Sequence, residues 1–190
     1  MHAWAQCIAC FFVEKGWLPE ELKPWCVYAA ERRCVQAASM ALLFVWGLVW
    51  APMWQVLLYT ASFVLLRRWA GGWHARTWGR CLVLSASVEA AGLVVLSVLQ
   101  RSGAASVGLA LAAGAVLWRC APALPAQMHA GPAERRACRG RLRVTMGVQA
   151  LLLGACLMCG QAPAAACIAV GCGTAAALAA AEGIKQRREE

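Results

Sequence analysis

Long apolar runs separated by short polar and basic segments organise this chain. A helix that crosses a membrane needs about 20 apolar residues, with roughly 17 to 25 usual. The shorter runs here require helix ends that extend into the membrane interface. The pattern predicts an all-α integral membrane protein with about six transmembrane helices, at 35–51, 52–66, 82–99, 103–118, 144–160 and 162–181.

The first two predicted spans form one uninterrupted apolar run, which is too long for a single ordinary span. Ala51 and Pro52 lie in the middle of this run. Proline starts helices well but interrupts them when it lies inside. The sequence therefore predicts a helical hairpin that turns at this pair.

The first 34 residues have a different pattern. Glycine and proline breaks at Gly16, Pro19 and Pro24 follow a stretch whose larger apolar residues recur at helix-like spacing, at Trp4, Cys7, Ile8, Phe11 and Phe12. This indicates an N-terminal amphipathic helix on the cytoplasmic membrane surface, or else a helix packed under the bundle. No basic residue precedes Lys15, so a cleavable signal peptide is not predicted. We expect an interfacial segment over 1–34, a six-helix membrane domain over 35–182 and a charged cytoplasmic tail over 183–190.

Composition agrees with a membrane location, because 62% of the residues are hydrophobic and only 14% are charged. Basic residues outnumber acidic ones, 18 to 9, yet they lie between apolar runs and form no continuous face for nucleic acid. Cytoplasmic loops carry the excess of Lys and Arg. Of the 18 basic residues only Arg101 falls in a predicted outer turn, which places both termini in the cytoplasm.

The candidate chemistry lies in "RRWAGGWHARTWGRCLVLS", residues 67–85. Cys81 begins the third apolar run, where a helix N-terminus and the neighbouring Arg76 and Arg80 favour the thiolate. Cys81 is therefore the candidate nucleophile. His74 precedes it in the loop and can act as general acid or base if the loop folds back.

Other residues of this segment have a supporting role in the hypothesis. Gly71 and Gly72 give the loop conformational freedom, and nearby backbone amides can stabilise an oxyanion. Arg67 can hold a carboxylate or a helix end, or else serves only to set the topology. Ser85 lies one turn from Cys81 and can bond the site, or bond its own helix backbone.

Further polar residues have weaker patterns. Glu89 is the one carboxylate inside a predicted span, which makes it a functional candidate, but about 12 Å of helix separates it from Cys81. The Cys-x-x-Cys pairs at 7–10 and 156–159 have no matching second pair and are interpreted as packing cysteines. The sequence predicts no metal site and no organic cofactor.

The Gly-Gly-x-His before a cysteine at a helix start resembles the core motif of the AgrB family, the accessory gene regulator membrane cysteine peptidases. The similarity extends to chain length, the six-helix pattern and a second basic loop that starts at Ala121 and Pro122. The resemblance implies catalytic roles for His74 and Cys81, with Arg67 and Gly72 in support.

It also implies a function: a cysteine endopeptidase that cleaves a short AgrD-like propeptide through a thioester, with cyclisation to a thiolactone or lactone for quorum sensing. The implied location is the bacterial cell membrane, the implied assembly a homodimer, and the expected partners are the propeptide and the lipid bilayer, without nucleic acid. The alternative is a non-enzymatic polytopic membrane protein, such as a transporter component or an assembly factor. The scarcity of charge inside the spans and the lack of repeat symmetry weigh against a transporter.

Overall fold

The computed structural model describes residues 2–71, 78–123 and 131–189, and these residues are almost entirely helical. Within these ranges the backbone forms no β-strand, and a single isolated bridge joins Gly71 to Ala123. The elements in chain order are α1 (His2–Glu14), the short 3-10 helix η1 (Glu20–Leu22), α2 (Lys23–Trp50), α3 (Met53–Ala70), α4 (Trp78–Leu99), α5 (Gly103–Cys120), α6 (Pro132–Met158) and α7 (Ala162–Glu189).

The chain divides into two compact units, Met1–Leu43 and Phe44–Glu190. In the first unit, α1 ends in a turn at Gly16, whose φ of 68° is the left-handed conformation that favours glycine. The rings of Phe11, Phe12 and Trp17 cluster at this turn, with centroids about 6 Å apart. The predicted N-terminal helix is therefore present, and its location at the membrane surface stays a prediction.

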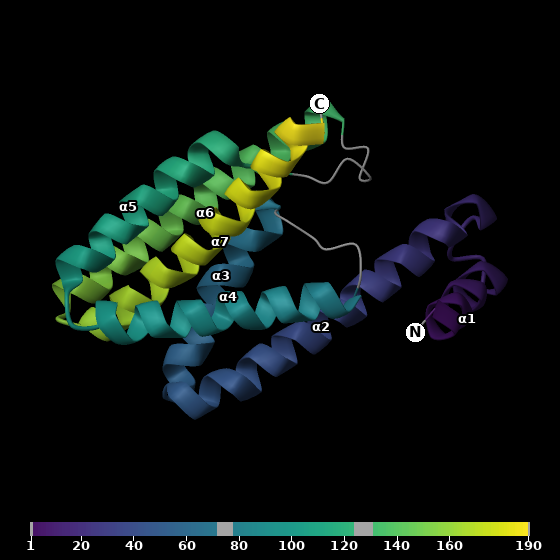
Figure 1. Cartoon of the computed structure of the whole chain (residues 1–190). Coiled ribbons are helices and arrows are strands. Elements are labelled where there is room, and N and C mark those ends of the chain that lie inside the picture. The colour runs from purple at the N-terminus through teal and green to yellow at the C-terminus, as the bar shows by residue number, and fades with distance from the viewer. Residues whose placement is uncertain (1, 72–77, 124–130, 190) are drawn as a thin grey trace. The chain divides into compact units, whose positions relative to one another are not determined.

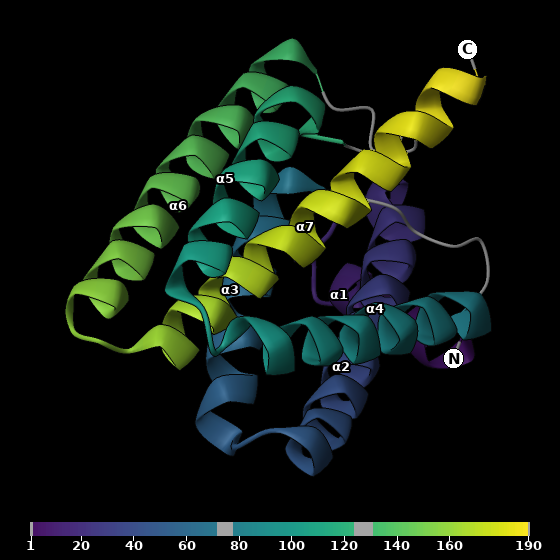
Figure 2. The same ribbon diagram turned by 60° about the vertical axis from the view of Figure 1, so that its left-hand side comes forward.

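In the second unit, α7 is the central helix and contacts α3, α4, α5 and α6 (Figures 1 and 2). Small residues allow these close contacts, because alanine and glycine let helix backbones approach each other. A Cβ atom at Gly171 would lie 2.7 Å from the Ser62 Cβ atom of α3 and 3.0 Å from the Phe63 nitrogen. The alanine-rich C-terminal sequence therefore forms the core of the bundle, with its buried face made largely of alanine.

The predicted break at Ala51 and Pro52 is confirmed. Helix α2 ends at Trp50 and α3 begins at Met53, with Pro52 at the N-cap of α3. The two helices meet beside the turn, where a Cβ at Gly47 would lie 2.8 Å from a Val56 methyl group. Proline ends one helix and starts the next at this point because it lacks the amide donor that a continuous helix needs.

Several helices are longer than the apolar runs that predicted them. Helix α6 begins at Pro132, well before residue 144, and α7 continues to Glu189, through the segment predicted as a tail. Pro132 occupies the first position of α6, and the Glu134 carboxylate accepts a hydrogen bond from the Gly131 amide at 3.2 Å. These start signals extend the helix through basic residues that hydropathy alone assigns to a loop.

Three helices of the described part of the chain are long and apolar enough to cross a membrane: Gly103–Cys120, Pro132–Met158 and, within α7, Ala162–Lys185. Helices α2 and α4 contain shorter apolar stretches, Met40–Trp50 and Ala86–Leu99. The outward surfaces of α5 and α6 carry large apolar side chains, such as Leu111 and Leu151, which are 70% and 76% exposed. Such surfaces suit contact with lipid. The count of six spans stays a prediction.

Candidate functional site

One end of the bundle carries a concentration of arginine and tryptophan side chains, which we call the basic end. It comprises the last turns of α3 and α5 and the middle of α6. The Arg141 guanidinium lies 4.8 Å from the ring centre of Trp69, and Arg143 lies 4.1 Å from that of Trp118. These cation–π contacts join α6 to α3 and to α5. Both loops that the sequence singled out leave the bundle from this end.

The first loop starts from a turn that Arg67 holds. The Arg67 Nη1 group donates a hydrogen bond to the Gly71 carbonyl at 2.8 Å, and the Gly71 amide donates to the Arg67 carbonyl at 3.2 Å. Gly71 has φ 72° and ψ −147°, a conformation that is essentially restricted to glycine. The structure thus brings together two of the predicted supporting residues, and it gives Arg67 a specific structural contact beyond a role in topology.

The second loop starts directly beside the first. The Ala123 amide donates a hydrogen bond to the Ala70 carbonyl at 2.8 Å, and Gly71 and Ala123 form a parallel bridge. Ala70, Ala121 and Ala123 are all buried. Sequence reasoning missed this tether, which involves alanines without any motif. As a consequence, the starts of the two loops are fixed to each other.

Cys81 lies in the first turn of α4, which begins at Trp78. The expected helix start before the cysteine is therefore present. Backbone N–H groups in a first turn lack helical partners and carry partial positive charge, which stabilises a thiolate there. The other predicted residues are not described: Gly72 and His74 lie outside the described residues, and so do the side chains of Cys81 and Ser85.

Glu89 lies farther along α4, in a polar contact between three helices. Its side chain is 2% exposed and hydrogen-bonds to the Tyr59 side chain of α3, which in turn bonds to Thr174 of α7. Gly92 makes room for this contact, because a Cβ there would lie 2.5 Å from the Tyr59 hydroxyl. The sequence identified Glu89 as unusual, but not its partners. The contact fixes the C-terminal half of α4 to the core. The first turn of α4, with Cys81, lies outside this contact.

The cysteines outside α4 form no disulfide among the described residues. Cys7 and Cys159 are exposed free thiols, and their Cys-x-x-Cys partners Cys10 and Cys156 are also free. The described part of the chain holds no cluster of three or more His, Cys, Asp or Glu side chains that suits a metal ion.

The chain matches a protein-family model. The family model described as AgrB, accessory gene regulator B, matches residues 5–178. The chain belongs to the AgrB family. The matched range encloses the Arg67–Gly71 turn, the start of α4 with Cys81, and the tether at Ala123. Together with the three apolar helices, this membership makes the chain a membrane protein of the accessory gene regulator type. Comparisons with curated proteins and with solved structures returned no match.

Proposed function

We propose that this AgrB-family protein is a cysteine endopeptidase that processes an AgrD-like propeptide at the cytoplasmic membrane surface. The observation that carries the proposal is the position of Cys81 in the first turn of α4, directly after the segment that holds His74, inside the range that the family matches. The helix start supplies a field that favours the thiolate, which is the reactive form of cysteine.

In the proposed reaction the Cys81 Sγ attacks a backbone carbonyl carbon of the propeptide. The peptide C–N bond breaks, and the leaving amine takes a proton from the His74 imidazolium. The product is a thioester between Cys81 and the N-terminal fragment. Water would then release a linear acid. An internal cysteine or serine of the fragment would instead release a thiolactone or lactone and regenerate the Cys81 thiolate, while the proton of that nucleophile returns to His74.

The tethered loop starts support this proposal because catalysis needs reacting groups that are held in place. Arg67 bonds the carbonyl of Gly71, and the Gly71–Ala123 bridge joins the two loop starts at the basic end. The loop that contains His74 therefore starts from a residue that is hydrogen-bonded on both its amide and its carbonyl group. The remaining supporting roles, of Gly72 and Ser85, are part of the same proposal and rest on the motif alone.

The test is the intact mass of a propeptide that is co-expressed with the protein. Short open reading frames adjacent to the gene supply the candidates. The wild type should shorten one of them, and Cys81→Ser and His74→Ala should leave it whole. Cys138→Ser and His129→Ala are matched controls that remove the same groups elsewhere, and both should process normally. A product lighter by one further water identifies cyclisation.

The opposite result is also clear. If a candidate is shortened equally by the wild type and by Cys81→Ser, the cysteine is not the nucleophile and the proposal is wrong. If no adjacent candidate is shortened, alkylation with a peptide chloromethyl ketone provides a second measurement. Selective labelling of Cys81 over Cys138 would keep the peptidase proposal, and equal labelling of both would support a non-enzymatic membrane protein.

A further inference from the structure

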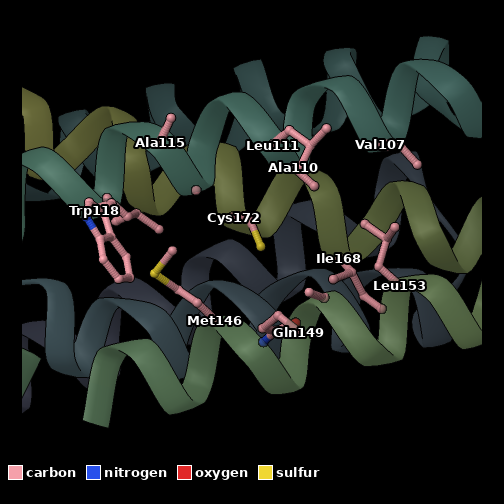
Figure 3. Close-up of a pocket in the computed structure, with 13 residues that line it drawn as sticks. Val107, Ala110, Leu111, Ala115, Trp118, Met146, Gln149, Leu153, Ile168 and Cys172 are labelled. Atoms are coloured by element: carbon pink, nitrogen blue, oxygen red, sulfur yellow. The ribbon is translucent and has the colours of Figure 1, made fainter. Parts of the chain in front are cut away.

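An apolar groove runs along the surface of the bundle between α5 and α6, with its floor on α7. Its volume is about 540 Å³, within the range of small-molecule sites. Figure 3 shows Trp118 and Met146 toward one end of the groove, and Val107 and Leu153 toward the other. The rim is exposed and the floor is buried, so the groove opens sideways, toward the surroundings of the helices. We call it the α5–α6 groove.

The length of this groove matches one leaflet of a membrane. From Val107 to Trp118 the lining follows α5 over a rise of about 16 Å at 1.5 Å per residue. Half of a typical hydrocarbon core of about 30 Å is about 15 Å. A groove of this depth accommodates an acyl chain that enters from one leaflet. It is too short to hold a helix that crosses the whole core.

The positive charge at one end of the groove indicates which lipid headgroup would suit it. Trp118 lies at that end, and the guanidinium of Arg143 is stacked on its ring at 4.1 Å. Stacking orients the guanidinium plane and leaves N–H donors at its edge, which suit a phosphate. Arg119, next to Trp118, is exposed in the last turn of α5. Arg143, stacked on an interfacial tryptophan, thus lies at the end of the groove where a headgroup would lie, and Arg119 adds a second positive charge to the same end of α5.

A polar group occurs partway along the groove. Gln149 is buried in its lining, and the amide oxygen accepts a hydrogen bond from Ser62 at 3.0 Å. This contact turns the oxygen toward α3 and satisfies it within the bundle. Gln149 lies six residues beyond Arg143 on α6, about 9 Å nearer the membrane centre. The rest of the lining consists almost entirely of aliphatic, methionine and cysteine side chains, which suit a hydrocarbon chain.

We propose that the α5–α6 groove binds one acyl chain of an anionic phospholipid, with the phosphate held at Arg143 and Arg119. The groove supplies an apolar surface one leaflet deep, and the arginines select the headgroup charge. A cation near the membrane surface contributes about 1 kcal/mol toward an anionic lipid, which corresponds to about a fivefold preference for each arginine. This inference concerns a surface apart from Cys81 and does not depend on peptidase activity.

Native mass spectrometry of the full-length protein in detergent tests the site, with phosphatidylglycerol and phosphatidylcholine of identical acyl chains as probes. We expect the wild type to retain one phosphatidylglycerol with a five- to 25-fold preference, from one or two arginines at about 1 kcal/mol each. Gly114→Leu places a side chain in the groove, since its Cβ would already lie 3.7 Å from the Met146 methyl group. It should lose the bound lipid. Gly108→Leu, on the same helix with nothing within 4 Å of its Cβ, should retain it.

A second pair of variants tests the headgroup. Arg143→Gln should still bind a chain but lose about fivefold of the preference for phosphatidylglycerol. Arg101→Gln, in the turn before the start of α5, should leave the preference unchanged. If Gly114→Leu does not fold, Ala115→Phe on the groove rim replaces it, with the exposed Ala112→Phe as its control.

Three results would overturn the proposal. The first is a Gly114→Leu or Ala115→Phe protein that retains phosphatidylglycerol as the wild type does. The second is equal retention of the two lipids by the wild type. The third is a groove-dependent adduct with the mass of a peptide, because it would assign the groove to an apolar peptide segment.

Discussion

Gly71 provides the sharpest test of the tethered loops. Its hydrogen bonds require a backbone conformation that is strained for any residue other than glycine. At φ 72° and ψ −147°, an alanine is strained by about 1–3 kcal/mol. Gly71→Ala must therefore either keep this strain or release it through a change in the backbone. Release would break the bond of the carbonyl with Arg67 and the bridge to Ala123.

The strain energy of Gly71→Ala sets how far the equilibrium shifts from the tethered to the released loop. If the whole strain is released by the loop, the equilibrium constant between the tethered and the released form falls by about five- to 150-fold, at about 1.4 kcal/mol for each factor of ten. Propeptide processing should fall by up to this factor, because the loop with His74 starts at this residue and the rate follows the population of the tethered form. The helical core is not touched by the substitution, so thermal unfolding of the purified protein should change much less than the rate.

The assay is the initial rate of propeptide cleavage in membranes, measured beside the unfolding temperature in detergent. Gly79→Ala is the matched control, since Gly79 lies in α4 with nothing within 4 Å of a built Cβ. It should process normally. If Gly71→Ala cleaves the propeptide at the wild-type rate while the protein remains folded, the tethered conformation is not needed for activity and the reasoning is wrong.

Two further substitutions test the packing that supports the site. Gly171→Ala should lower stability by about 1–3 kcal/mol or more, because its Cβ would meet Ser62 at 2.7 Å and force α7 away from α3. Gly92→Ala should cost a similar amount by displacing the Tyr59 hydroxyl, 2.5 Å from its Cβ. Unfolding in detergent measures both. Gly147→Ala, exposed with nothing within 4 Å, should be neutral or slightly stabilising, and equal losses in all three variants would contradict the packing argument.

The placement of most helices follows from local sequence. An apolar run long enough for a membrane helix does form a helix, and Pro52 separates two of them because its ring and missing amide act within its own turn. Helix ends were harder to predict. A prediction from hydropathy ends a helix at the first charged residues. The start of α6 instead depends on Pro132 and on the hydrogen bond to Glu134.

The candidate site divides in the same way. Cys81 at a helix start and the special role of Gly71 could be predicted from residue types, since both depend on the local backbone. The partner of the loop, Ala123, could not be predicted, because the bridge uses backbone groups that every residue has. Tyr59 as the partner of Glu89 is a contact between two helices, and only their relative rotation decides it.

The order of residues along the chain therefore predicts a helical membrane protein, the break at Pro52, and the thiol and imidazole that are the candidates for catalysis. These properties depend on hydrophobicity, charge and proline over a few turns of chain. The packing of helices that are distant in sequence was needed to show that α7 forms the core, that two loops start side by side, and that α5 and α6 leave an apolar groove between them. Such features arise from close packing between distant segments, and in a membrane that packing depends on which small residues face each other.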